Sequence, residues 1–351
     1  MNKRKPTIVD IANELGISPS AVSKAFSNHP RMSEQTKKEV LRMAKSLGYK
    51  RNNMATGLRM GKSGLIGVMV PWINLNFFST AIKGIEDVLG AAGYSILIGQ
   101  SKDSEEKEAV QVNAFLNAQV EGIIASIAAN TQNHTHFKHA IDAGVKVILF
   151  DRTIPGLEVT QVMIDDFDAA YKATLHLIEQ GYKRIGLISG PFRLLPYRNR
   201  VDGYKAALRE NGRMVDEGLI LETDVVIDCG KTSAVQMMAH PDPPDAIFCL
   251  SDLLALGAMR AIVQIGKRIP DEIGLIGFSN EDFTTYVSPS LSSVDQFSEE
   301  MGNTAAKALL EQLEVGKSND TDQSFIPDKH VLTSKLLIRE SSTIIKTSLM
   351  L

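Results

Sequence analysis

Cysteine and tryptophan are nearly absent from this chain. Its 351 residues include two cysteines and one tryptophan, and aromatic residues make up only 6% of the whole. Cys229 and Cys249 stand alone, without the closely spaced partners that a disulfide framework, a metal site or a redox-active dithiol requires. The sequence therefore indicates domains that are held together by apolar cores, which a hydrophobic content of 44% is large enough to fill.

Long apolar runs are also missing. The longest, residues 65–73, is interrupted by Gly67 and Pro71 and falls well short of the roughly 20 apolar residues that span a bilayer. The N-terminal MNKRKPTIVD contains basic residues, but no apolar segment follows them as it would in a signal peptide. We expect a cytoplasmic protein that does not interact with a membrane.

Acidic residues are scarce in one part of the chain only. Residues 1–62 contain 13 Lys and Arg against 4 Asp and Glu, a charge of +9, whereas the other residues contain 25 against 37, a charge of −12. A basic segment attached to an acidic body is typical of a protein that binds nucleic acid. The total length is consistent with two or three domains.

Residues 7–26, TIVDIANELGISPSAVSKAF, predict two short helices joined by a tight turn. Thr7 can cap the first helix, and Gly16 can end it, because glycine readily adopts the left-handed conformation of a helix C-terminus. Ser18 can cap the second helix. The pattern predicts a helix-turn-helix.

The outward face of the second predicted helix is small, polar and basic, with Ser20, Ser23, Lys24 and Ser27. A helix without bulky side chains can enter the DNA major groove, where serine and lysine reach base edges and phosphates. A solvated amphipathic hairpin is the commoner interpretation when such a pattern stands alone. A third predicted helix over residues 33–47 and the local positive charge favour a DNA-reading headpiece.

The stretch after the third helix, residues 49–62, has two interpretations. Asn52 could cap a short helix with Leu58 on its apolar face. Gly57 would cost that helix about 1 kcal/mol relative to alanine, and helices shorter than about 12 residues are marginal in water. Local sequence favours a plain basic linker, and the alternative is a segment that folds only on DNA.

From residue 65 onward, apolar strand segments alternate with amphipathic helices. LIGVMVP, YSILIGQ, GIIAS and KVILFD form a first series of predicted strands, and VMID, RIGLISG, VVI, AIFCLS and IGLIGFS form a second. Strands that alternate with helices of this length predict parallel sheets covered on both faces. The fold class is therefore α/β, with two similar lobes behind a helical headpiece.

The C-terminal region is expected to return to the first lobe. A helix over residues 299–316 follows SVDQ, and FIP and HVLTSKLLI predict terminal strands. The predicted divisions are residues 1–48 for the headpiece, 49–62 for the hinge, 63–164 with 296–325 for the first lobe, 165–295 with 326–340 for the second lobe, and 341–351 for a frayed tail.

Polar and aromatic residues follow several of the predicted strands. They are Asp151 and Arg152 after KVILF, residues 193–200 after LISG, Asp252 after FCLS, and Phe77 and Phe78 after the first strand. Ligands of open parallel sheets bind outside the carboxyl ends of the strands. Each residue alone is more simply a helix cap or a surface residue, but together they would make a small-molecule site with aromatic walls.

These motifs give the chain a specific resemblance along nearly its whole length. It resembles the lactose and galactose repressor family of bacterial transcription regulators in the order and spacing of TIVDIANELGIS, AVSKAF, LGYKRN, NNMATGL, LIGVMVP, LFDR, GYKRIGLISGP, YRNRVDGYKAAL, SDLLALGAMRAI, IGLIGF and SLSSVDQ. The resemblance implies a clamshell fold like that of periplasmic sugar-binding proteins. It also implies a homodimer that binds double-stranded DNA at a pseudo-palindromic operator under the control of a small-molecule effector.

The resemblance implies specific roles in DNA binding. Pro19, Ser20 and Lys24 occupy positions that read bases, and Leu58 matches a hinge leucine that wedges into the minor groove and kinks the duplex. The full set of expected DNA contacts is Thr7, Pro19, Ser20, Ser23, Lys24, Ser27, Asn28, Asn52 and Leu58.

The resemblance implies a second set of roles in the cleft. Asp151, Arg200 and Asp252 match positions that hydrogen-bond the effector, and Gln296 lies at a crossover between the lobes. The full set of expected effector contacts is Phe77, Phe78, Asp151, Arg198, Arg200, Asp252 and Gln296. A sugar or sugar derivative is the expected effector. Cys229 and Ser279 replace an aromatic residue and an aspartate that are frequent in the family, so the effector could also be neither a typical sugar nor a purine.

Three weaker motifs do not change this interpretation. Gly230-Lys231-Thr232 lacks the upstream glycine of a phosphate-binding loop. His134, His136 and His139 lack the other ligands of a metal site, and the carboxylates between residues 165 and 168 are explained by a helix start. We expect no metal, no cofactor and no catalytic set. The alternatives that stay open are a solute-binding protein without a DNA function and an α/β enzyme that uses the cleft.

Overall fold

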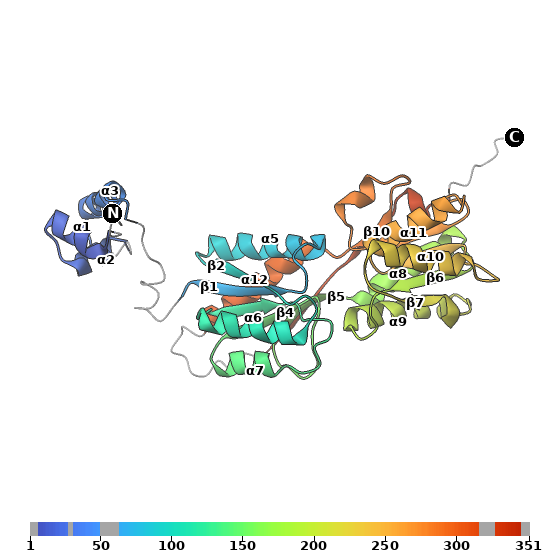
Figure 1. The fold of residues 1–351 in the computed structure, drawn as a ribbon, viewed down its shortest axis with the longest axis horizontal. Coiled ribbons are helices and arrows are strands. Elements are labelled where there is room, and N and C mark those ends of the chain that lie inside the picture. Colours follow the sequence, from blue (N-terminus) through green and yellow to red (C-terminus); the bar gives the residue numbers. More distant parts are fainter. Residues whose placement is uncertain (1–5, 27–30, 50–62, 316–326, 345–351) are drawn as a thin grey trace. The chain divides into compact units, whose positions relative to one another are not determined.

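The computed structural model describes residues 6–26, 31–49, 63–315 and 327–344 (Figure 1). It consists of two compact units, Met1–Ser63 and Gly64–Leu351, and each is considered on its own. Within the described ranges, no helix is both long and apolar enough to cross a bilayer.

The first unit contains the three expected helices, α1 (Ile8–Leu15), α2 (Pro19–Phe26) and α3 (Glu34–Ser46). Thr7 and Asp10 form a capping box at the start of α1, and Gly16 follows that helix in the left-handed conformation. The core of the unit consists of Ile11, Ala12, Val22, Ala25, Val40 and Ala44. Few residues are buried, as expected for so short a unit.

Tyr49 belongs to this small core. Its ring centroid lies 5.6 Å from that of Phe26, and its backbone N–H donates to the carbonyl of Ala44. The expectation that the linker begins at residue 49 is therefore one residue too early, because Tyr49 packs on the helices. Residues 50–62, which include Asn52 and Leu58, lie outside the described ranges.

Two six-stranded sheets form the framework of the second unit. The first has the order β11-β5-β4-β3-β1-β2, and all its strands are parallel: β1 (Leu65–Val70), β2 (Ser95–Gln100), β3 (Gly122–Ala125), β4 (Lys146–Phe150), β5 (Thr160–Ile164) and β11 (Lys329–Leu332). The second has the order β12-β10-β9-β8-β6-β7: β6 (Ile185–Ser189), β7 (Ile220–Glu222), β8 (Ala246–Cys249), β9 (Gly274–Phe278), β10 (Ser292–Asp295) and β12 (Lys335–Leu337). Only β12 runs antiparallel to its neighbour.

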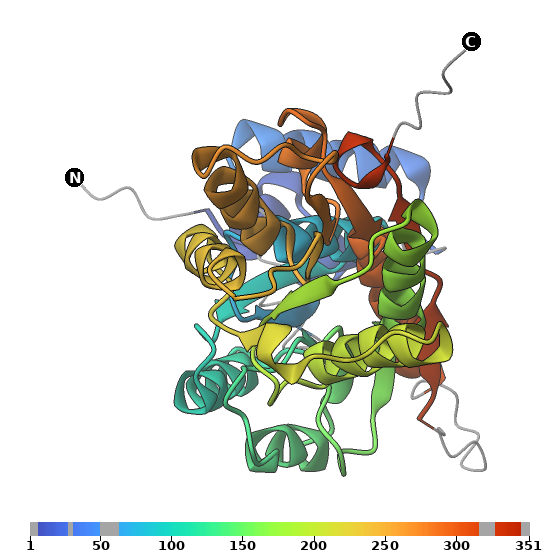
Figure 2. The same ribbon diagram turned by 90° about the vertical axis from the view of Figure 1, so that its right-hand side faces the viewer.

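Helices cover both faces of each sheet. The first lobe has α5 (Asn76–Ala91) and α12 (Ser298–Val315) on one face and α6 (Glu105–Asn117) and α7 (Thr135–Asp142) on the other (Figure 1). The second lobe has α8 (Asp166–Gln180) and α9 (Leu195–Glu210) on one face and α10 (Ile227–Met238) and α11 (Asp252–Gln264) on the other, as Figure 2 shows end-on. The prediction of two parallel α/β lobes is confirmed.

Within the described ranges, the chain passes between the two lobes at three places. The crossings follow β5, β10 and β11, because each of these strands is succeeded by an element of the other lobe. On the first lobe, α12 packs closely on α5: a Cβ at Gly302 would lie 2.1 Å from the carbonyl oxygen of Ala81. The helix that follows the second crossing is therefore fixed to the first lobe, as expected from the sequence.

Two local predictions are wrong. VVI does not form a strand: β7 is Ile220–Glu222, and Ile227 already opens α10, because a short apolar run is compatible with either structure. Residues 326–340 do not belong wholly to the second lobe, since β11 pairs in parallel with β5 of the first. HVLTSKLLI is thus divided between two sheets.

The C-terminal tail begins later than residue 341. Ser341 and Ser342 are fully buried, within the short 3-10 helix η3 (Glu340–Ser342). The hydroxyl of Ser341 donates to the carbonyl of Leu275, and that of Ser342 lies 2.7 Å from the hydroxyl of Ser292. These serines stay buried because every hydroxyl finds a polar partner, a feature that the sequence pattern does not reveal.

Candidate functional site

The second helix of the first unit presents the expected polar face. Pro19, Ser20 and Lys24 are exposed on α2, whereas Val22 and Ala25 are buried against the other helices. Ser18 caps this helix by accepting a hydrogen bond from the backbone N–H of Ala21. The helix therefore offers a small, polar and basic surface that can fit a major groove.

Thr7 also has a structural role, which is separate from its expected DNA contact. Its hydroxyl donates to Asp10 Oδ2 over 2.7 Å, and the backbone N–H of Asp10 donates back to that hydroxyl. The residue fixes the start of α1, which in turn positions the turn before α2. Ser27 and Asn28, like Asn52 and Leu58, lie outside the described residues.

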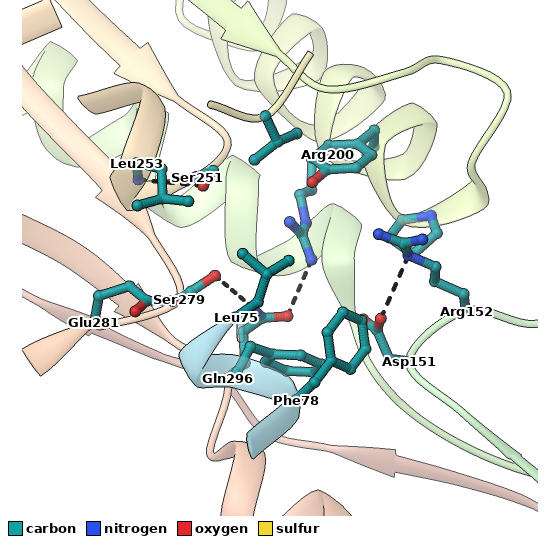
Figure 3. Close-up of a pocket in the computed structure, with 14 residues that line it drawn as sticks. Leu75, Phe78, Asp151, Arg152, Arg200, Ser251, Leu253, Ser279, Glu281 and Gln296 are labelled. Atoms are coloured by element: carbon teal, nitrogen blue, oxygen red, sulfur yellow. Dashed lines mark hydrogen bonds and ion pairs between the residues drawn. The ribbon is translucent and has the colours of Figure 1, made fainter. Parts of the chain in front are cut away.

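The second unit contains a cleft between its two lobes, at the carboxyl ends of the strands (Figure 3). About 560 Å³ of space lies between its walls, a figure that includes open solvent. Its lining combines aromatic and aliphatic side chains with a few charged and amide groups: Leu75, Phe77, Phe78, Asp151, Arg152, Pro196, Tyr197, Arg200, Val225, Ser251, Leu253, Ser279, Glu281 and Gln296.

Arg200 is the central polar residue of this cleft. Only 4% of it is exposed, and its guanidinium carbon lies 3.7 Å from the centroid of the Phe278 ring. Its Nε donates to Asp166 over 2.7 Å, and Nη2 donates to Gln296 over 3.0 Å. With a third, longer contact to the carbonyl of Leu250, three of its five N–H groups are engaged, and two are left for a ligand.

The Asp166 carboxylate and the Gln296 amide hold Arg200 in place. Burial raises the pKa of Asp166, and the positive charge of Arg200 opposes that rise. The amide nitrogen of Gln296 donates to Ser279 Oγ over 2.9 Å. The guanidinium is therefore fixed from two sides before any ligand arrives, which lowers the entropy cost of binding one.

Asp151 and Arg152 form the opposing polar group on the first lobe. Asp151 follows β4 in the left-handed conformation, with φ of +58°, and accepts a hydrogen bond from Ser126 over 3.3 Å. Burial raises the pKa of its carboxyl. Arg152 donates to Asp103 over 2.6 Å, and its guanidinium lies over the ring of Phe78.

Asp252 lies behind the wall of the cleft and does not line it. It is fully buried at the start of α11, where its two oxygens accept hydrogen bonds from Ser293 Oγ and from the backbone N–H of Glu281. Burial is the main reason that its pKa is raised to about 6. Its position supports the loop that carries Glu281, and the expectation of a direct effector contact is not met in this structure.

The structure brings together most of the residues that the sequence singled out. Phe77, Phe78, Asp151, Arg200 and Gln296 line one cleft, whereas Arg198 is exposed outside it. The sequence reasoning missed Leu75, Val225, Ser251, Leu253 and Glu281, which approach from the starts of three helices and from one loop. Arg152 and Ser279, which the sequence had already drawn attention to, also line it.

One contact joins the rims of the two lobes directly. Arg193, in the loop before α9, donates from Nε to the carbonyl of Ala129 on the first lobe over 2.9 Å. The backbone N–H of Ala129 donates to Asp103, the same carboxylate that holds Arg152. The rim contact is thus connected to the lining of the cleft.

The weaker motifs have structural explanations. Gly230-Lys231-Thr232 lies inside α10 and not in a loop. His136 lies 2.9 Å from the buried Glu108, and no group of three metal-ligating side chains occurs in the described part of the chain. Asp165 caps α8 by accepting from the backbone N–H of Asp168, as expected for carboxylates at a helix start.

Comparison with protein families gives two matches. The family described as bacterial regulatory proteins, lacI family, matches residues 7–52, and the periplasmic binding protein-like domain matches residues 174–342. The first covers the helix-turn-helix unit, and the second covers most of the second lobe together with the crossings after β10 and β11.

Individual proteins extend the likeness over nearly the whole chain. The chain is 32% identical to the HTH-type transcriptional repressor CytR of Escherichia coli K12 over 88% of its length and 90% of that protein. It is also 32% identical to catabolite control protein A of Priestia megaterium over 88% and 92% of the two chains. Its fold matches the lac repressor dimer bound to operator and an anti-inducer with a TM-score of 0.85, at 23% identity over 97% of this chain and all of the other.

Proposed function

Because the chain belongs to the lacI family of bacterial regulatory proteins, we propose that it is a sequence-specific transcriptional repressor whose operator affinity is controlled by a small molecule bound between its two lobes. The observation that carries this proposal is the combination of a basic helix-turn-helix unit with a cleft in which Arg200, Gln296 and Asp151 meet aromatic walls. The curated relatives reported above are named as transcriptional regulators and not as enzymes.

The first unit is proposed to contact the operator through α2. Pro19, Ser20, Ser23 and Lys24 would face the bases and phosphates of the major groove, and Thr7 would add a backbone contact at the start of α1. The remaining proposed contacts, outside the described residues, are Ser27, Asn28 and Asn52 in or near the groove and Leu58 as the minor-groove wedge.

The second unit is proposed to sense the effector. Arg200, Asp151 and Gln296 would hydrogen-bond it, while Phe77 and Phe78 would cover an apolar face. A ligand shifts the DNA-binding equilibrium only through its different affinities for the two lobe arrangements, typically by about 1–3 kcal/mol of coupling.

A homodimer would read the two halves of a pseudo-palindromic operator. Part of its interface is proposed to include the edge strand β2, where Leu97 and Ile98 are 38% and 47% exposed. An exposed apolar edge strand favours association with another chain. Val263 and Ile265, near the end of α11, are exposed in the same way on the second lobe.

The decisive experiment selects operators from a random duplex library with the full-length protein. We expect enriched sequences to be palindromic, and affinity for them to exceed that for random duplex by about 10³-fold or more, with a steep dependence on salt. A thermal-shift screen against sugars, sugar acids, nucleosides and nucleobases then identifies effectors. Equal affinity for selected and random duplexes would rule out the regulator and leave a solute-binding protein, whereas chemical turnover of a bound compound would indicate an enzyme.

A further inference from the structure

The charged side chains that line the cleft are two arginines and two carboxyl groups, and each arginine has a further carboxylate partner behind the lining. Arg152 and Arg200 both line it, but each already forms an ion pair with a carboxylate outside the lining, Asp103 at 2.6 Å and Asp166 at 2.7 Å respectively. The two arginines therefore offer hydrogen-bond donors to a ligand but little uncompensated positive charge.

Two other carboxyl groups, those of Asp151 and Glu281, line the cleft without an ion pair as short as these. Asp151 contacts the hydroxyl of Ser126 and, at 3.8 Å, the Nε of Arg152, whose shorter ion pair is with Asp103. Among the residues that the structure describes, no lysine or arginine forms an ion pair with Glu281. Counted together with Asp103 and Asp166 behind it, the lining therefore has more carboxyl groups than arginines, and both lobes contribute carboxyl groups.

Among the described residues, no positively charged side chain faces Glu281. The groups that face it are the carboxylates of Asp252 on α11 and Asp282 beside it, and the backbone amide of Phe77 at the start of α5. The pKa of Glu281 is raised to about 7, with burial as the main cause; the two aspartates contribute to the rise and the amide opposes it. At pH 7 a carboxyl group with this pKa is only partly ionised, and a positive group close to it would favour the charged form.

The other polar side chains of the cleft suit a hydroxylated ligand. Ser251, Ser279 and the amide of Gln296 can both donate and accept hydrogen bonds, as the hydroxyl groups of a polyol can. The rings of Phe77 and Phe78, whose centroids lie 5.1 Å apart, provide an apolar wall against which carbon-bound hydrogens can pack.

We propose that the effector is a small polyhydroxylated molecule with a basic nitrogen, of the amino-sugar class, and that Glu281 selects it by binding that nitrogen. This inference rests on the proposed function, since it names the ligand class of the same site. A protonated amine replaces the missing positive charge beside Glu281, which a neutral hydroxyl group cannot do. A sugar acid or phosphate ester would instead add a negative charge to a cleft in and behind whose lining carboxyl groups already outnumber arginines.

The test compares matched hexoses with the full-length protein. Glucosamine, galactosamine and mannosamine are each measured at pH 7 against the parent hexose, and glucuronate and galacturonate against theirs, by calorimetry and thermal shift. We expect at least one amine to bind about 10-fold or more tightly than its parent, and the uronates to bind more weakly than theirs. Glu281→Gln should reduce the preference for the amine to about twofold or less, while Asp282→Asn, which removes the neighbouring exposed carboxylate, should retain it.

Three outcomes would overturn the proposal: no amine binds better than its parent hexose, a uronate is preferred, or the preference for an amine persists in Glu281→Gln. Binding of the selected operator is measured on the same preparations. A protein that binds its operator but shows no preference for amines would contradict the ligand class alone. A protein without operator preference would contradict the proposed function as well.

Discussion

Arg200 and Gln296 are joined by a hydrogen bond of 3.0 Å from the guanidinium to the side-chain amide oxygen. Arg200 lies on α9 in the second lobe, whereas Gln296 lies in the segment that crosses from β10 to α12 in the first. A ligand that engages Arg200 therefore acts on a group in direct contact with a crossing segment. This contact is a physical route by which occupancy of the cleft can alter the arrangement of the lobes.

Replacement of Arg200 should abolish the effector response, and this loss can be distinguished from a loss of folding. Arg200→Ala leaves the buried Asp166 carboxylate without its partner, which typically costs about 3–5 kcal/mol. We expect urea unfolding to show this loss of stability. Adding Asp166→Asn to the same chain should recover part of the lost stability. The double variant should still bind operator without responding to effector. Loss of operator binding in this stabilised variant would instead assign Arg200 a structural role.

Because of Asp252, the free energy of unfolding should fall as the pH rises. The pKa of Asp252 is raised from 3.8 to about 6 in the folded state, so the folded protein binds more protons than the unfolded chain between these values, and unfolding becomes easier with increasing pH. The full effect is about 3 kcal/mol in order of magnitude. Urea unfolding at pH 4.5 and 7.5 should show a smaller decrease for Asp252→Asn than for the wild type. The same decrease in both would show that Asp252 is not the group responsible, and Asp282→Asn serves as the exposed control.

The sequence predicts the elements well because their signals are local. Thr7, Ser18 and Asp165 act as helix caps, each within a few residues of the helix that it starts. VVI fails because three apolar residues fit the end of a strand or the start of a helix equally well. The division of HVLTSKLLI between two sheets depends on a crossing between lobes, which no local pattern indicates.

The cleft was harder to predict than the fold. Its position follows from parallel topology, which explains why Asp151 and Arg200 were found. The orientation of each side chain does not follow: Asp252 comes directly after a buried strand, yet its oxygens are taken by Ser293 and by the backbone of Glu281. Glu281 itself lies in a polar loop, and in the sequence this loop looks like any other surface turn.

Lys24 offers a direct test of how α2 contacts DNA. If its ammonium group pairs with a phosphate, Lys24→Gln should weaken binding to all duplexes by a similar factor and reduce the slope of log affinity against log salt by about 1. If it reads a base, the loss should be specific to the operator and amount to about 1–3 kcal/mol. Fluorescence anisotropy with selected and random duplexes at several salt concentrations distinguishes the two. Unchanged binding to both would remove Lys24 from the interface.

Arg193 should contribute to effector affinity although it does not line the cleft. Its hydrogen bond to the carbonyl of Ala129 joins the two lobes, so Arg193→Ala should weaken the arrangement in which both lobes contact the ligand. An intramolecular hydrogen bond contributes about 0.5–1.5 kcal/mol, which corresponds to a loss of roughly 2- to 13-fold in affinity. The measurement is a calorimetric titration with an effector from the screen, and Arg198→Ala, an exposed arginine on α9 outside the lining, is the matched control. A loss of affinity in Arg198→Ala with none in Arg193→Ala would reverse the roles that the structure gives these two arginines.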